Sequence, residues 1–216
     1  MSPRRVTLTF DNGPTPGITE RVLEVLDRAT LRATFFVLGK KLADPAALAL
    51  ASTAHAAGHW IGNHTLTHSV ALGDNPEADY AAREIGETQA LIGDLARPEK
   101  LFRPYGNSGR IGPHLLSQAA LAYLLEHRYR TVIWNSLPGD WRDQDGWVEA
   151  GVAQVKSQDW SVVVLHDIET GCLRRLPEFL ERLGDLDVTF EQDFPKEMTL
   201  TRDGREVSMK KEYVRA

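Results

Sequence analysis

The chain has 216 residues, of which 42% are hydrophobic and 25% are charged, a balance typical of one globular α/β domain with a sizeable core. Its formal net charge of −5 argues against nucleic acid as a partner. No apolar run is long enough to span a membrane, no apolar leader precedes Val6, and Cys172 is the only cysteine. From these features we predict a cytoplasmic protein that has no membrane partner and no internal disulfide.

Short apolar runs alternate with segments of helical periodicity up to about residue 190. The predicted strands are residues 6–10, 33–38, 60–63, 101–102, 129–134, 161–165 and 187–190. The predicted helices are residues 19–29, 45–57, 75–95, 113–126, 145–158 and 173–183. This alternation predicts an α/β fold with a parallel sheet covered on both faces, either open or closed into a barrel.

The C-terminal part of the chain differs in composition from the rest. Residues 191–216 are polar, and Asp203-Gly204 between two short β-like runs is typical of a hairpin turn. We therefore divide the chain into a domain of residues 1–190 and a C-terminal extension of residues 191–216 with a possible β-hairpin. The sequence gives no signal for the oligomeric state.

Polar side chains with catalytic potential follow five of the predicted strands. In parallel α/β sheets, ligands bind beyond the C-terminal ends of the strands. These positions hold Asp11, Asn12, His64, His68, Arg103, Tyr105, Asp140, Trp141 and His166. We therefore expect these nine residues to surround one site.

His64 and His68 are four residues apart, a spacing that can place two imidazoles on one metal ion. The same spacing is common on ordinary surfaces, so the hypothesis depends on the polar residues of the neighbouring strands. With Asn12 as an oxygen ligand, such a site keeps a position open for water, and zinc lowers the pKa of a bound water towards about 7. Asp11, next to Asn12, is placed to act as general base. The alternative is that Asp11 only caps the turn that follows.

His166 ends the sixth predicted strand, where it can act as general acid towards a leaving amine. The alternative is a histidine that forms hydrogen bonds within its loop. Arg103 could orient Asp11 and keep it ionised, and Asp140 could do the same for His166.

Two aromatic residues could contact a substrate. Tyr105 and Trp141 offer flat faces on which a sugar ring can stack, and the backbone N–H of Tyr105 could stabilise an oxyanion. For Trp141 simple packing is an equally good interpretation.

Together these segments resemble the polysaccharide deacetylase family (NodB homology, carbohydrate esterase family 4) from about Arg5 to Thr189. The similar segments are residues 9–14, 33–39, 58–68, 102–106, 140–141 and 165–166. The resemblance implies a distorted (β/α)7 barrel and metal-dependent removal of an N-acetyl group from an amino sugar or a chito-oligosaccharide. It also implies that residues 1–190 are the catalytic domain and that the metal is zinc, with cobalt or nickel as alternatives.

By position, the resemblance assigns a role to each polar residue. It makes Asp11 the base and His166 the acid, and it makes His64 and His68 metal ligands. Arg103 would orient Asp11, and Asp140 would tune His166.

Two departures from the family pattern affect this assignment. Asn12 occupies the position of the usual aspartate ligand, so we expect weaker metal binding or replacement of the side chain by water. The segment Arg103-Pro104-Tyr105-Gly106 is one residue shorter than the usual form with two prolines, so we expect a possible shift in register between Arg103 and Asp11.

The leading hypothesis is therefore a metal-dependent hydrolase of carbon–nitrogen bonds that acts on an N-acetylated sugar or a small N-acyl compound. The lack of an export signal favours a soluble substrate over a cell-wall polymer. Two alternatives stay open: a hydrolase of a non-sugar amide or ureide, and a catalytically silent carbohydrate-binding protein in which Asn12 marks a decayed metal site.

Overall fold

In the computed structural model, which describes residues 3–169 and 171–215, strand β1 (Arg4–Asp11) is the last but one strand in the sheet order and pairs with three other strands. It pairs in parallel with β2 (Thr34–Val37) and β7 (Trp160–His166), while β8 (Val188–Glu191) pairs with its N-terminal half. The register places Asp11 opposite His166. The candidate base and the candidate acid are thus neighbours on adjacent strands.

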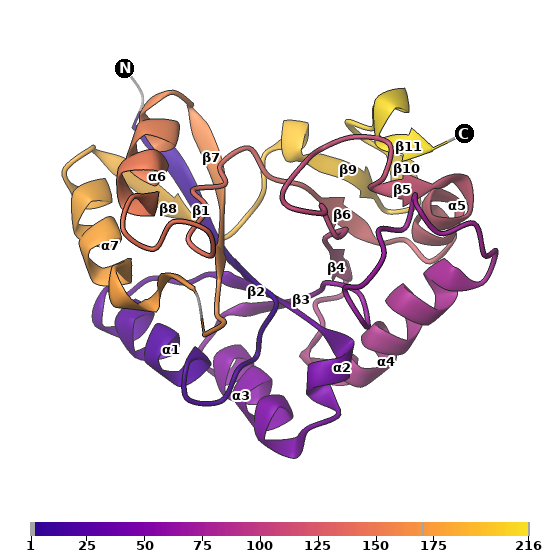
Figure 1. The fold of residues 1–216 in the computed structure, drawn as a ribbon, viewed down its shortest axis with the longest axis horizontal. Coiled ribbons are helices and arrows are strands. Elements are labelled where there is room, and N and C mark those ends of the chain that lie inside the picture. Colours follow the sequence, from indigo (N-terminus) through magenta and orange to yellow (C-terminus); the bar gives the residue numbers. More distant parts are fainter. Residues whose placement is uncertain (1–2, 170, 216) are drawn as a thin grey trace.

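The described residues form a sheet of nine strands that curls into a half-barrel (Figure 1). The strand order is β10-β9-β6-β4-β3-β2-β1-β7, and β8 pairs with β1. The other strands of this sheet are β3 (Trp60–Asn63), β4 (Leu101–Phe102), β6 (Arg130–Val132), β9 (Thr199–Arg202) and β10 (Arg205–Glu206). The pairs from β6 through β4, β3, β2 and β1 to β7 are all parallel. Their C-terminal ends therefore share one edge, as the sequence predicts.

The segment after β6 joins the two sides of the curl. The backbone N–H of Ser136 donates to Val162 O at 3.2 Å, and the N–H of Val164 donates to Ser136 O at 2.9 Å. The side chain of Asn135 adds hydrogen bonds to Trp160 O at 2.9 Å and from Val162 N at 2.7 Å. These contacts join the segment after β6 to the first five residues of β7.

Helices cover the outer face of the curled sheet (Figure 1). They are α1 (Thr19–Arg28), α2 (Gly39–Leu42), α3 (Pro45–Ala56), α4 (Thr88–Ile92), α5 (Gln118–Glu126), α6 (Trp147–Lys156) and α7 (Leu176–Gly184). Side chains alternate along β1: Val6, Leu8 and Phe10 join the core packed against α1, α3, α6 and α7. Thr7, Thr9 and Asp11 are buried on the other face, so Asp11 points into the curl.

Two predicted helices are shorter than expected. Within the predicted helix 75–95, the structure has a π-helix, η1 (Ala82–Glu87), then α4, and then a 3₁₀ turn (Gly93–Leu95). A buried hydrogen bond between the end of β3 and the carbonyl of Ile85 competes with regular helix formation there. The helix predicted from residue 113 begins only at Gln118, where Ser117 Oγ accepts from Ala120 N at 3.1 Å. The residues before it pair as β5 (Leu116–Ser117) with β11 (Val214–Arg215).

The C-terminal segment is packed on the rest of the protein. Strand β9 pairs antiparallel with both β6 and β10. Phe194, Leu200 and Tyr213 are buried in a second core cluster, separate from the one packed against α1, α3, α6 and α7. Arg130 donates to Phe194 O at 3.2 Å and forms a salt bridge with Asp193 at 2.6 Å. Within the described residues, no helix is both long and apolar enough to cross a membrane.

Candidate active site

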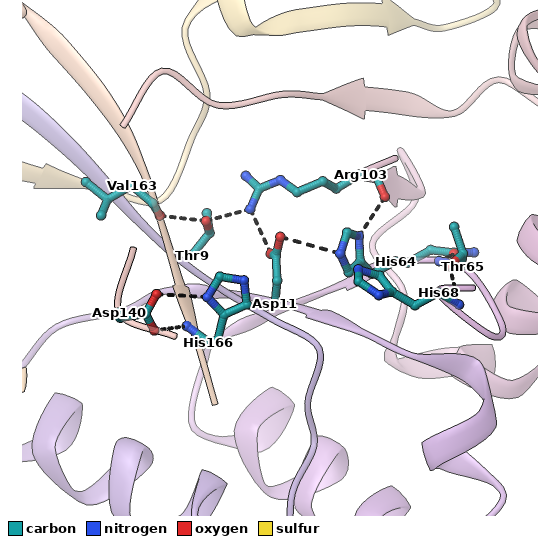
Figure 2. A network of polar contacts seen from close by, with 10 residues as sticks. Thr9, Asp11, His64, Thr65, His68, Arg103, Asp140, Val163 and His166 are labelled. Carbon is teal, nitrogen blue, oxygen red and sulfur yellow. Dashed lines mark hydrogen bonds and ion pairs between the residues drawn. The ribbon is translucent and has the colours of Figure 1, made fainter. Parts of the chain in front are cut away.

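Asp11 is the centre of the polar network at the C-terminal edge of the sheet (Figure 2). Arg103 Nη1 donates to Asp11 Oδ1 at 2.8 Å and to Thr9 Oγ1 at 2.6 Å, and Thr9 Oγ1 donates to Val163 O at 2.6 Å. The shift in register expected from the shortened Arg103–Gly106 segment therefore does not occur. Asp11 binds a guanidinium rather than the amides of the next turn, which removes the capping interpretation.

Arg103 is held in place by apolar packing as well as by charge. Its side chain is fully buried, and its guanidinium lies 4.1 Å from the ring centroid of Phe36. Its backbone N–H donates to Asn63 O at 2.9 Å, which ties the end of β4 to the end of β3.

The surroundings of Asp11 keep it ionised. Burial raises the pKa of the carboxyl, but the positive charge of Arg103, the nearby imidazoles of His64 and His166, and the hydrogen bond from Arg103 outweigh burial and lower the pKa below its ordinary value. Arg103 occupies Oδ1, whereas Oδ2 lies 3.6 Å from His64 Nε2. Asp11 is therefore a carboxylate near neutral pH, with one oxygen directed towards the histidine pair.

The two histidines lie together beside Asp11. His64 Nδ1 is 2.8 Å from Arg103 O, and because a carbonyl oxygen only accepts, Nδ1 carries the proton and Nε2 keeps its lone pair. The ring centroid of His68 lies 4.9 Å from that of His64 and 3.9 Å from that of Tyr105. Burial, followed by the proximity of His64, lowers the pKa of His68 to about 3, and burial also lowers that of His64. Both rings are thus neutral, the form that binds metals.

Asn12 completes a set of ligands that fits a divalent metal. Its Oδ1 is buried without a hydrogen-bond partner, and its backbone has φ of 75°, in the left-handed region. Within residues 3–169 and 171–215, no three His, Cys, Asp or Glu side chains form a group that could hold a metal. A metal here would instead be held by two imidazoles and an amide oxygen, donors that suit zinc, cobalt or nickel.

His166 and Asp140 form a second pair of polar residues at the site. Asp140 is fully buried; its Oδ1 lies 2.9 Å from His166 Nδ1, and its Oδ2 accepts from the backbone N–H of His166 at 2.8 Å. Burial opposes charge on His166, but the hydrogen bond and the charge of Asp140, with Asp11 and Asp167 adding to them, raise its pKa above the ordinary value. The Trp141 ring packs edge-on against the imidazole at 4.7 Å.

One cavity of about 230 Å³ brings most of the predicted residues together. Seven of the nine line it: Asp11, Asn12, His64, His68, Tyr105, Trp141 and His166. The other two, Arg103 and Asp140, lie behind the cavity wall and bind Asp11 and His166. In Figure 2, Asp11 lies between His166 and the histidine pair.

The sequence analysis missed the apolar and loop residues that complete the cavity. They are Gly106, Asn107, Ser108, Gly109, Trp134, Leu137, Val164 and Ile168. Val164 could have been found, because strand alternation places it on the same face as His166. The loop at 106–109 gives no such periodic signal.

The sequence profile of the polysaccharide deacetylase family matches residues 1–129, a span that includes Asp11, both candidate ligand histidines and Arg103. A chitooligosaccharide deacetylase of Rhizobium leguminosarum bv. trifolii is 35% identical over 171 residues, which is 78% of this chain and 73% of the relative. The chain belongs to the polysaccharide deacetylase family.

Solved structures of carbohydrate esterases confirm the predicted fold class of this family member. A family 4 carbohydrate esterase from Streptomyces lividans, in complex with acetate, superposes with a TM-score of 0.74 and 26% identity over 91% of this chain and 96% of that one. A family 4 acetyl xylan esterase from Clostridium thermocellum, in complex with a cobalt ion, superposes with a TM-score of 0.68 and 28% identity over 87% of each chain.

Proposed function

We propose that this family member is a metal-dependent deacetylase that hydrolyses the N-acetyl group of an amino sugar in a substrate of the chitooligosaccharide or peptidoglycan type. The observation that carries the proposal is the pairing of Asp11 with His166 at one cavity. Arg103 keeps Asp11 deprotonated, and Asp140 keeps His166 protonated. Two groups with pKa values moved in opposite directions are what combined base and acid catalysis needs.

The proposed metal ligands are Asn12, His64 and His68. An ion bound there, zinc by preference, supplies Lewis acidity that polarises the acetyl carbonyl and makes water a better nucleophile near neutral pH. Support comes from the unpartnered Oδ1 of Asn12, the two neutral imidazoles and the cobalt ion of the clostridial esterase.

The protein groups divide the proton transfers between them. Asp11 takes a proton from the attacking water through Oδ2, the oxygen that Arg103 leaves open. The backbone N–H of Tyr105 donates to the carbonyl oxygen as it gains negative charge. His166 gives its proton to the sugar nitrogen as the C–N bond breaks. One water and one amide thus become acetate and a free amine.

The cavity suits a small acyl group attached to a sugar ring. Its volume of about 230 Å³ is below the roughly 300–1,000 Å³ of a pocket that encloses a drug-sized ligand. It therefore accommodates an acetamide and part of one sugar ring, with the remainder of an oligosaccharide outside. Trp141, Trp134 and Leu137 provide apolar surface for the acetyl methyl and the sugar face.

Turnover of a panel of substrates tests the proposal, measured as acetate release for the acetylated compounds and by chromatography of the hydrolysis products for the others. The panel contains N-acetylated chitooligosaccharides, a peptidoglycan fragment, an O-acetylated xylan oligomer, and a cyclic amide and a ureide, each with added zinc. Release from the amino sugars alone, abolished in Asp11→Asn, supports the proposal. Turnover of the cyclic amide or ureide alone assigns the other hydrolase activity, and sugar binding without turnover assigns the silent binding protein.

The cytoplasmic location is likewise a proposal, which cell fractionation of the source organism tests. Recovery in the soluble intracellular fraction would favour chitooligosaccharides, and recovery at the cell wall would favour peptidoglycan.

A further inference from the structure

The turn that carries both candidate ligand histidines, residues 64–68, has an unfavourable backbone. Thr65 has φ of 73° and His68 has φ of 54°. Each non-glycine residue in this left-handed region costs on the order of 1–2 kcal/mol, and such conformations persist only where surrounding contacts enforce them. The structure must therefore contain contacts that hold this turn.

The strongest of these contacts comes from Glu84, on the π-helix η1. Its carboxylate is buried at 4% exposure; Oε2 accepts from Leu66 N at 3.0 Å and from Thr67 N at 2.9 Å, and Oε1 accepts from Thr67 Oγ1 at 2.7 Å. Among the described residues, no Lys, Arg or His forms a salt bridge with it, so the turn itself supplies these donors. Hydrogen bonds to an ionised acceptor are roughly twice as strong as neutral ones.

A second contact ties the same helix to the start of the turn. Asn63 Nδ2 donates to Ile85 O at 2.8 Å, while its Oδ1 accepts from Thr65 N at 3.0 Å. The π-helix thus holds the turn at residues on both sides of Thr65. Single-turn π segments occur often at functional sites, where they direct side chains out of the regular helical ladder.

We propose that Glu84 is a positioning residue: its buried carboxylate holds the turn that places His64 and His68 in the cavity wall together with Asn12, and it thereby sets the affinity of the site for metal. The inference rests on the proposed metal-dependent function. Glu84 does not line the cavity, so its effect passes through the backbone of Leu66 and Thr67. Outer contacts that orient metal ligands typically change metal affinity by about 10- to 100-fold.

Glu84→Gln tests the proposal, because glutamine keeps the size but loses the charge and one acceptor. The matched control is Glu87→Gln, an exposed position on the same π-helix. Zinc affinity is measured by chelator competition, and hydrogen exchange of the Leu66 and Thr67 amides is measured in metal-free protein. We expect Glu84→Gln to weaken zinc binding by about tenfold or more and to accelerate exchange at both amides, while Glu87→Gln changes neither.

If Glu84→Gln does not fold, Thr67→Val replaces it, because this change removes the hydrogen bond to Oε1 and the contact with Ser69 Oγ but keeps both backbone donors to Oε2. It should weaken zinc binding by a smaller factor. Zinc affinity and amide exchange equal to those of the native protein would overturn the proposal.

Failure of the proposed function gives a different result. If the native protein binds no zinc, the metal assignment is wrong, and amide exchange in the metal-free variants alone decides whether Glu84 holds the turn. Unchanged exchange would then refute its positioning role.

Discussion

Replacement of Asp140 by Asn tests how this protein keeps its general acid protonated. In the native structure both carboxylate oxygens of Asp140 interact with His166, at Nδ1 and at the backbone N–H. Asn keeps one acceptor but removes the charge, and its amide group faces a donor. Burial, which opposes charge on His166, is then offset only by Asp11 and Asp167, so the pKa of the imidazole falls below that in the native protein.

The size of this effect follows from the contact. A hydrogen bond to a charged group contributes about 1.5–3 kcal/mol, so the imidazole of Asp140→Asn should bind its proton about 10- to 150-fold more weakly. Because the acid must be protonated, kcat/KM falls as pH rises through the pKa of His166. The alkaline limb of the pH profile should therefore move to lower pH in the variant.

Protein stability should change with pH in a matching way. The pKa of His166 is raised in the folded state, so its stabilising contribution is complete below its unperturbed pKa of about 6.5 and is lost as pH rises through the raised value. The free energy of unfolding in urea should thus fall more for Asp140→Asn at about pH 5.5 than at about pH 8.5.

The assays are a kcat/KM profile from acetate release and an NMR titration of the His166 imidazole. Asp145→Asn is the control, because Asp145 is exposed and pairs with Arg174 rather than with His166. An alkaline limb and a His166 titration that both match the native protein would refute the role given to Asp140.

Three further substitutions test the other side of the site. Arg103→Met leaves Asp11 buried without its cation, which should cost about 3–5 kcal/mol of unfolding free energy and move the acid limb of kcat/KM to higher pH; an unmoved limb would show that Arg103 does not keep Asp11 ionised. Asn12→Asp should tighten zinc binding about tenfold or more in chelator competition, because it adds a negative charge to the ligand set; an equal affinity would remove Asn12 from that set. Gly13→Ala would place a Cβ 2.0 Å from Asp167 Oδ2, so it should cost about 1–3 kcal/mol and lower Tm; an unchanged Tm would contradict the close packing.

The sequence predicted the location of the site because the relevant geometry is simple. Parallel strands end at one edge of the sheet, so polar residues that follow different strands must converge there. Asp11 and His166, 155 positions apart in sequence, become register partners for this reason. The contacts of Arg103 and Asp140 behind them follow from the same rule.

Other features depend on tertiary contacts that leave no local pattern. The helical periodicity of residues 75–95 predicted a long regular helix. Contacts that join this segment to the turn at residues 64–68, through Glu84 and Asn63, favour a π-helix over part of it. The pairing of β9 with β6 joins residues about 70 positions apart, as in Thr131 and Thr201. A polar composition alone does not reveal that such a segment completes the sheet.

Acetate release by metal-free and zinc-restored protein, measured together with bound zinc, tests the central claim most directly. The native protein should lose activity after chelation and recover it with one equivalent of zinc, whereas His64→Ala should recover neither zinc nor activity. Full acetate release by the chelated protein, or stoichiometric zinc in active His64→Ala, would contradict the account.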